Sequence, residues 1–362
     1  MDKALKTRQI CLFFAVFLPV IKFFMMPSVV ASVSAQDMWI SVIIDILLDF
    51  AVILTVSLAL KDEDTDFFGT LEKRYGKTFS KVVMAFYAVF FLLKTLLSVN
   101  EQKDYVEYTL YMTNPNVLTF MPVFLIVFYL SLQKLRVWGR LADGLIIVAL
   151  FGYALLFALS VPNTDLNELL PVAKSGYKNI FSGAFKAENW FSDGAYFLFF
   201  VGNYEKSKKS TLKILLSFAA SGIIVLIFTV IFYGTFSSVA FRQRFALTEI
   251  SKYSSVINNI GRFDYLALFS LLFTAVFSLS LPFYFAVNLI TRILSLKTPA
   301  IVSVVVCGAS AAFHLIFNRY FFTIETFVTE IAYLYTLILG TVLPVALSLT
   351  MIRRRKNETQ SV

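Results

Sequence analysis

Charged side chains inside apolar segments have the clearest chemical meaning in this sequence. Lys22, Asp45, Asp49 and Lys94 each interrupt an apolar run long enough to cross a bilayer. A charge at the centre of a membrane helix costs about 2.5–3.5 kcal/mol on insertion scales, so each requires a partner or a function. We therefore take these four residues as candidate ion-pair or coupling groups.

The spacing of the two aspartates restricts their charge states. Asp45 and Asp49 are four residues apart and share one face of a helix. Two stacked carboxylates in an apolar medium are unfavourable unless a cation lies between them or one is protonated. Lys22 is the nearest basic residue in sequence, and Lys94 is a second candidate. A structural Lys–Asp pair and a group that couples proton or substrate movement both fit this pattern.

Lys22 also stands between two prolines, Pro19 and Pro27. Proline donates no backbone hydrogen bond and disturbs the preceding turn of a helix. One interpretation is a kinked helix in which a carboxylate neutralises Lys22. The other is a break between two half-helices, whose free backbone groups face a ligand or a wet cavity. In that case the binding residues are Val20, Ile21, Lys22, Phe23 and Phe24.

A second irregular segment lies at about 189–203, where the apolar part is too short for a full crossing. Asp193-Gly194 is a helix-breaking pair within it, and glycine permits close approach of a ligand. Asp193 either caps a short helix at the membrane surface or belongs to a binding site. The site residues on this side are Ser192, Asp193, Gly194 and Tyr196.

The elements that must position these groups are membrane helices. Of the 362 residues, 58% are hydrophobic and 15% are charged, against about 45–50% and about 25% in soluble domains. The sequence therefore predicts one integral membrane domain over residues 1–362. Ten apolar segments are long enough, or nearly so, to cross: about 9–34, 38–60, 79–99, 115–132, 137–160, 189–203, 212–235, 264–291, 298–318 and 324–352.

The distribution of Lys and Arg predicts the orientation. With ten crossings and a cytoplasmic N-terminus, 21 of the 32 basic residues fall in cytoplasmic segments and 9 in outer ones. This bias places both termini in the cytoplasm and explains the +9 formal charge without nucleic-acid binding. The alternative of a cleaved signal ending near Ala35 is disfavoured, because the apolar region exceeds the usual length of about 7–15 residues.

The remaining polar residues indicate no enzyme. Cys11 and Cys307 lack metal-binding spacing, His314 is interpreted as a packing residue, and no catalytic triad or phosphate loop can be assembled. We expect no catalytic residues, metal or cofactor. The polar stretch from Asn100 to Glu107 is expected to form a solvated extension of the third crossing.

Irregular helices at crossings one and six together indicate a known transporter architecture. Transporters built from two inverted repeats bind substrate where broken helices meet near mid-membrane. The repeats here would be about 9–160 and 178–352. Half-helix N-termini attract a carboxylate, and Asp193 suits an amine, so the pattern points to a small zwitterion.

Three short motifs resemble the B-subunit family of bacterial spore germination receptors. They are Met26-Pro27-Ser28 with Ala35-Gln36-Asp37-Met38-Trp39-Ile40-Ser41, then Asn167-Glu168-Leu169-Leu170-Pro171-Val172 with Gly176, and Ile260-Gly261-Arg262-Phe263-Asp264. The motifs are individually weak, and their order along the chain carries the resemblance. One departure is Ile21-Lys22-Phe23-Phe24, where family members often have glycine.

The resemblance implies an all-α, ten-helix fold of the amino acid–polyamine–organocation (APC) transporter superfamily, a LeuT-like 5+5 inverted repeat with helices 1 and 6 broken. It also implies a nutrient-sensing subunit of the spore inner membrane that works beside A and C subunits. The germinant, an amino acid by this analogy, would bind between helices 1 and 6. Two alternatives stay open: a proton-coupled amino-acid permease, and a structural membrane scaffold.

Overall fold

The computed structural model describes residues 5–360 apart from 62, 64, 111–115, 208, 253–263, 318–325 and 327. Across these residues the chain is helical, and the β-type contact that occurs is an isolated bridge between Leu5 and Tyr204. Pro115 and most of the third motif, residues 260–263, lie outside the described residues.

The first apolar segment changes its backbone geometry three times. It starts as α1 (Thr7–Leu12), continues as a π-helix, η1 (Phe13–Phe17), and then as a 3-10 helix, η2 (Pro19–Phe23). Phe24 has φ −86° and ψ −94°, outside the helical region, and α2 (Met26–Ser34) follows. The regular α-helical bonding therefore lapses around Lys22, between the two prolines.

Most other helices have bounds close to the predicted ranges. The long ones are α3 (Met38–Ala59), α5 (Lys77–Leu110), α6 (Asn116–Ser131), α7 (Leu135–Ser160), α10 (Ser210–Phe236), α12 (Asp264–Ile293) and α13 (Ala300–Phe317). The last segment comprises η9 (Val328–Ala332), α15 (Tyr333–Leu337), η10 (Ile338–Val342) and α16 (Leu343–Gln360). Short helices connect them: η3 (Ala35–Asp37), α4 (Phe67–Tyr75), η4 (Val161–Asn163), η5 (Leu166–Leu169), η6 (Ser237–Arg242) and α11 (Ala246–Lys252).

The sixth predicted segment differs most from its expected range. The helix α8 (Tyr177–Ala187) begins well before residue 189, and a second helix, α9 (Gly194–Phe200), follows after an irregular stretch. Its polar residues, such as Lys178 and Lys186, hide the start of α8 from a hydropathy criterion.

Six helices among the described residues are long and apolar enough to cross a membrane. They are Met26–Ala59, Lys77–Tyr108, Leu135–Asn163, Ser210–Arg242, Tyr265–Ile293 and Glu330–Arg353. Pro122–Ser131 and Ala300–Ile316 are apolar but shorter. The chain is thus suited to a multi-pass membrane protein, and the count of ten crossings remains a prediction.

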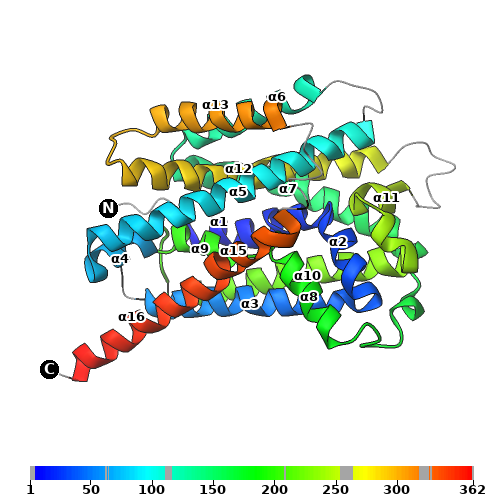
Figure 1. The fold of residues 1–362 in the computed structure, drawn as a ribbon, viewed down its shortest axis with the longest axis horizontal. Helices are drawn as coiled ribbons and strands as arrows, with labels where there is room; N and C mark the ends of the chain where they lie inside the picture. The colour runs from blue at the N-terminus through cyan, green and yellow to red at the C-terminus, as the bar shows by residue number, and fades with distance from the viewer. Residues whose placement is uncertain are drawn as a thin grey trace.

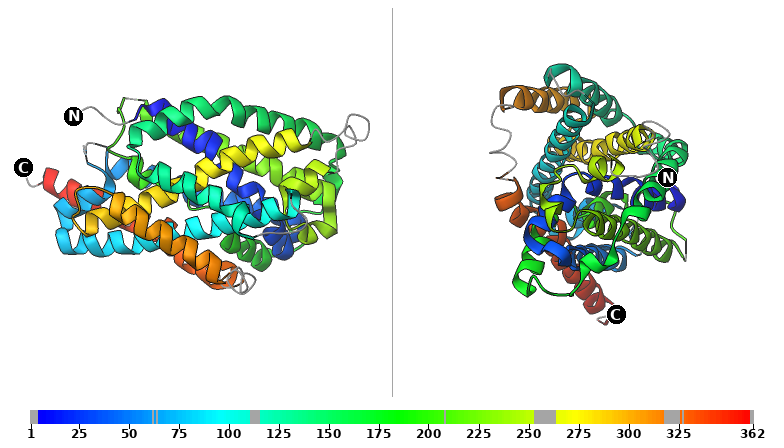
Figure 2. Two further views of the ribbon diagram at one scale, coloured as in Figure 1. Left: turned by 90° about the horizontal axis from the view of Figure 1, so that it is seen from above. Right: turned by 90° about the vertical axis from the view of Figure 1, so that its right-hand side faces the viewer.

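The interrupted segments lie in the interior of the helix bundle. In Figure 1, α5, α6, α12 and α13 form the upper part, while α3, α8, α10 and α16 form the lower part. The segment η2 contacts both α10 and α12, and α9 contacts α3, α4 and η10. The two further views in Figure 2 agree with this central position.

Aromatic side chains fill much of this interior. Phe199 stacks on Phe285 with ring centroids 4.1 Å apart, and Phe13 stacks on Phe277 at 5.7 Å. These contacts join the first segment and α9 to α12. Because each aromatic pair adds about 0.5–1.5 kcal/mol beyond area burial, the abundance of Phe helps to hold the irregular segments in place.

About half of the polar stretch after the third crossing is buried, which corrects the expectation that residues 100–107 form a solvated extension. The helix α5 continues to Leu110, and Glu101 and Lys103 are buried. The reason is tertiary: the Glu101 carboxylate accepts hydrogen bonds from the Trp190 indole (2.8 Å) and the Met25 amide (3.3 Å).

Candidate ligand-binding site

A buried ion pair joins the two irregular segments. The Lys22 Nζ of η2 lies 2.6 Å from Asp193 Oδ2, just before α9, and these side chains are 1% and 4% exposed. The same Nζ lies 4.9 Å from the centre of the Phe191 ring, a cation–π contact, and 3.4 Å from the Leu18 carbonyl oxygen. The ammonium is therefore held by both irregular segments.

The backbone between α8 and α9 is irregular for local reasons. The amides of Trp190 and Phe191 both donate to the Ala187 carbonyl, which closes one tight turn. Ser192 then has φ +62°, a conformation that non-glycine residues rarely adopt. This turn places the Asp193 carboxylate beside Lys22.

Asp49 reaches the start of α9 from a neighbouring helix, α3. Its two carboxylate oxygens accept hydrogen bonds from the amides of Asp193 (2.9 Å) and Gly194 (2.8 Å). Asp193 itself makes no side-chain capping bond, so its carboxylate is directed to Lys22 instead. Asp45, four residues from Asp49, is 0% exposed, and neither of its oxygens has a hydrogen-bond partner among the described residues.

Glu188 is a further buried acid, outside the set of residues predicted from sequence. Its Oε1 accepts hydrogen bonds from the hydroxyls of Ser192 (2.8 Å) and Thr341 (3.0 Å). Thr341 belongs to η10, so the last segment of the chain also contacts the irregular turn. Glu188 lies five residues before Asp193, close enough in sequence to belong to the same turn. It was missed because the predicted segment began at about residue 189, one position after it.

Lys94 approaches the same turn from α5. Its Nζ donates to the Phe191 carbonyl oxygen and is 6% exposed as a residue. Lys94 acts electrostatically on Asp193, Glu188 and Asp49. The four residues first singled out by their position in apolar segments therefore converge on one region, around the start of α9.

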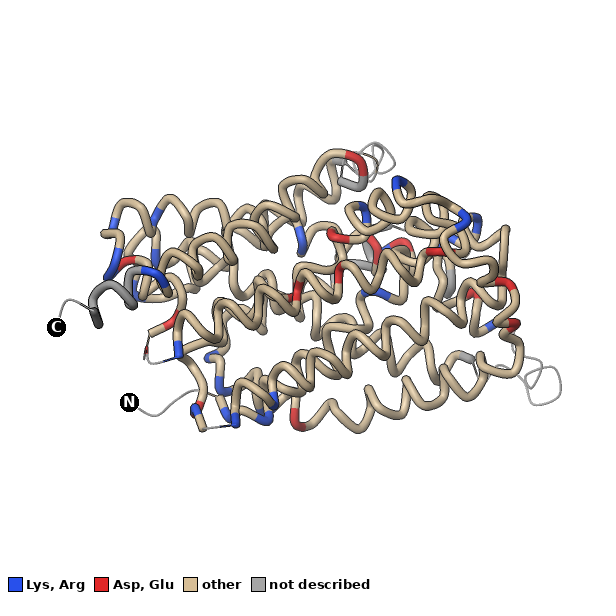
Figure 3. Tube along the Cα trace, turned by 90° about the horizontal axis from the view of Figure 1, so that it is seen from below, with Lys and Arg blue, Asp and Glu red and all other residues tan. Residues whose placement is uncertain are grey.

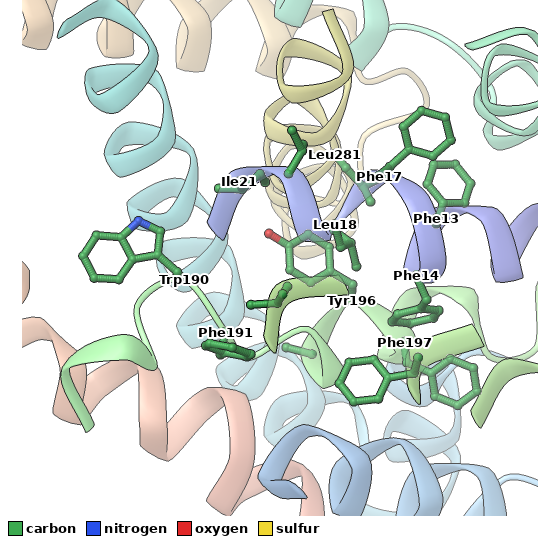
Figure 4. Packing of buried hydrophobic residues seen from close by; sticks show 14 of the residues in the cluster. Phe13, Phe14, Phe17, Leu18, Ile21, Trp190, Phe191, Tyr196, Phe197 and Leu281 are labelled. Carbon is green, nitrogen blue, oxygen red and sulfur yellow. The ribbon is translucent and has the colours of Figure 1, made fainter. Parts of the chain in front are cut away.

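The predicted binding residues fall into two groups. Figure 4 shows Tyr196 pointing from α9 towards the segment that holds Leu18 and Ile21. Phe23 instead stacks on Phe228 with centroids 4.1 Å apart. All nine predicted residues are buried: Val20, Ile21, Lys22, Phe23, Phe24, Ser192, Asp193, Gly194 and Tyr196. Phe24 contacts the Tyr105 ring edge-on at 4.7 Å, so both phenylalanines take part in the aromatic packing of the interior.

We define the buried charge cluster as six residues that act electrostatically on one another. They are Lys22, Asp45, Asp49, Lys94, Glu188 and Asp193. Two cations and four acids do not balance if all are ionised. Among the described residues no group of acids, histidines and cysteines could hold a metal ion. By its chemistry, an acid of this cluster suits an amine and a lysine suits a carboxylate, while the amides of Asp193 and Gly194 already donate to Asp49.

Comparison with known proteins gives a family and a fold. The family model described as spore germination protein matches residues 4–342. A crystal structure of MhsT in complex with L-phenylalanine has a TM-score of 0.63 at 13% identity, covering 95% of this chain and 86% of that one. Structures of a manganese transporter from Eremococcus coleocola have a TM-score of 0.61 at 12% identity, covering 96% and 78%. These are LeuT-fold transporters. No curated protein sequence matches the chain.

Proposed function

The chain belongs to the spore germination protein family, and from that premise we propose that it is the membrane subunit of a spore nutrient-germinant receptor. It binds a small nutrient, an amino acid in our proposal, between the Lys22 segment and the start of α9, and it signals to partner subunits without chemical turnover. The observation that carries the proposal is the Lys22–Asp193 ion pair, which joins the two irregular segments in the interior.

The architecture in this proposal is ten crossings arranged as two inverted repeats, about 9–160 and 178–352, within a single membrane domain. The likeness to LeuT-fold transporters over most of the chain supports it. So do the lapses of α-helical bonding in the first segment and between α8 and α9. In such folds, broken helices supply the substrate site.

The ion pair also suggests the class of ligand. A zwitterionic amino acid carries an ammonium that suits Asp193 and a carboxylate that suits Lys22. Such a ligand can enter between the two side chains and leave both charges paired, which avoids the cost of an isolated buried charge. The MhsT structure, which contains L-phenylalanine, supports an amino acid as the ligand in this fold.

Orientation and partners complete the proposal. Many Lys and Arg residues gather at the end of the molecule where α1 begins and α16 ends (Figure 3). By the positive-inside tendency, we place both termini in the cytoplasm, with the protein in the spore inner membrane. Its proposed partners are the receptor's A and C subunits and the lipid bilayer.

Ligand-induced thermal shifts of the purified protein test the binding site. We expect one or more compounds among the standard amino acids, sugars and nucleosides to raise the Tm of the wild type. Lys22→Met should abolish that shift in purified, folded variant protein, whose own starting Tm is expected to be lower because Asp193 loses its partner. Lys186→Met is the matched control, because Lys186 pairs with Glu330 at a partly exposed position, and it should keep the shift. A ligand shift that survives in Lys22→Met would disprove the proposed site.

A proton-coupled amino-acid permease is the second candidate, with Lys22 and one of Asp45, Asp49 or Asp193 as coupling groups. The buried acids that exceed the lysines in number favour it. Radiolabelled uptake into proteoliposomes separates the two functions. A receptor subunit binds the nutrient without accumulating it, whereas saturable accumulation driven by a pH gradient would establish the permease.

A further inference from the structure

Asp45 is the member of the buried charge cluster whose contacts the proposed function does not explain. It lies on α3, is 0% exposed, and both of its carboxylate oxygens lack a hydrogen-bond donor among the described residues. Asp49, one turn further along the same helix, accepts hydrogen bonds from the backbone amides of Asp193 and Gly194. Two chemically identical side chains on one helix face therefore have opposite surroundings.

The charges around Asp45 do not compensate for this lack of donors. The groups that act on it are Glu188 at the end of α8, Asp49 on its own helix, and Lys22 of η2. Two of the three are acids, and Lys22 is already paired with Asp193 at 2.6 Å. Lys94, the other lysine of the cluster, donates to the Phe191 carbonyl oxygen.

An isolated carboxylate in a low-dielectric interior takes up a proton rather than remain charged. We infer that Asp45 is a buried proton-binding site, which holds a proton in the resting protein and makes the carboxyl group neutral. The inference concerns the resting state and does not depend on the proposed nutrient or on the receptor function. It makes Asp45 the group that gives up a proton when a rearrangement brings a cation or water to it.

A proton fits this place better than a metal cation. Hard cations such as Ca²⁺ and Mg²⁺ require about six or more oxygen ligands. Within the described parts of the chain, no cluster of acids, histidines and cysteines could hold a metal ion. Asp45 and Glu188 together offer too few ligands, whereas a proton needs one carboxyl oxygen.

Infrared difference spectroscopy tests the protonation state directly. A protonated carboxylic acid has a C=O stretching band that is separate from those of carboxylates and amides. We expect the wild-type minus Asp45→Asn difference spectrum at neutral pH to contain such a band, and the matched Asp49→Asn difference to lack it. No band in the Asp45→Asn difference would overturn the inference, and so would a band that disappears in Glu188→Gln instead.

The pH dependence of stability supplies a second test. A folded protein that binds one more proton than the unfolded chain becomes less stable as pH rises. The unfolding equilibrium constant of the wild type should therefore increase by up to about tenfold per pH unit above about pH 5 through this group. Asp45→Asn, neutral and similar in shape, should lose this contribution to the slope.

The same measurement distinguishes a proton from a monovalent cation. If replacing choline with sodium in the buffer stabilises the wild type but not Asp45→Asn, the site binds sodium and the inference fails. If Asp45→Asn does not fold, the wild type and Glu188→Gln together decide the question, because the band should be present in both. In that case, the carboxylic acid band of the wild type should weaken as the pH is raised, and a protein without such a band at neutral pH would refute the inference.

Discussion

Measuring how much the Lys22–Asp193 ion pair contributes to stability tests the site most directly. The two side chains are 1% and 4% exposed, and their charged atoms are 2.6 Å apart. Removing one partner of a buried pair leaves an uncompensated charge and costs about 3–5 kcal/mol. We expect Lys22→Met and Asp193→Asn each to lower the free energy of unfolding by about this amount. Lys94, which also acts on Asp193, should bring the cost of Lys22→Met towards the lower end.

The double variant Lys22→Met/Asp193→Asn should behave differently, because it removes both charges together. Replacing a whole buried pair by neutral groups is often close to neutral for stability. We therefore expect the double variant to be more stable than either single variant, which means an interaction energy of several kcal/mol between the two sites.

Reversible unfolding in mixed micelles with increasing denaturing detergent measures these free energies. The pair Lys186–Glu330 is the control, since its side chains are 20% and 51% exposed, and exposed pairs contribute about 0–1 kcal/mol. If the losses in the two single variants simply add in the double variant, Lys22 and Asp193 do not compensate each other and the reasoning is wrong.

Two further predictions concern the packing of the irregular segment. Gly194→Ala should lower the Tm, because its Cβ would stand 2.6 Å from the Cβ of Val52 and overpacking costs about 1–3 kcal/mol. Gly308→Ala in α13 is the control, because a Cβ at Gly308 would meet no atom within 4 Å. The higher helix propensity of alanine should leave the Tm of this variant unchanged or raised. Equal changes in Tm at both glycines would contradict the packing argument. Trp190→Phe removes the indole donor at 2.8 Å from the Glu101 carboxylate and should cost about 1.5–3 kcal/mol, as for hydrogen bonds to charged groups. Denaturation that matches the wild type would show that this bond contributes nothing.

The positions of the helices follow from local properties of the sequence. Apolar length, prolines and the Asp193-Gly194 pair depend on neighbouring residues, and the helical bounds of α3, α7, α10 and α12 lie close to the predicted ranges. The same local criterion missed the start of α8 at Tyr177 because that helix is partly polar. It also placed Glu101 in solvent, although Glu101 is buried and accepts hydrogen bonds from the Trp190 indole and the Met25 amide.

Local properties of the sequence predicted five of the six members of the buried charge cluster and the two irregular segments, because apolar length and turn-forming residues depend on neighbouring residues. The pairing of these charges depends on how the helices pack. Lys22 pairs with Asp193, 171 residues away in sequence, rather than with Asp45 or Asp49. The spacing of Asp45 and Asp49 makes them equivalent on one helix face. The approach of α9 gives amide donors to Asp49 and leaves Asp45 without any among the described residues.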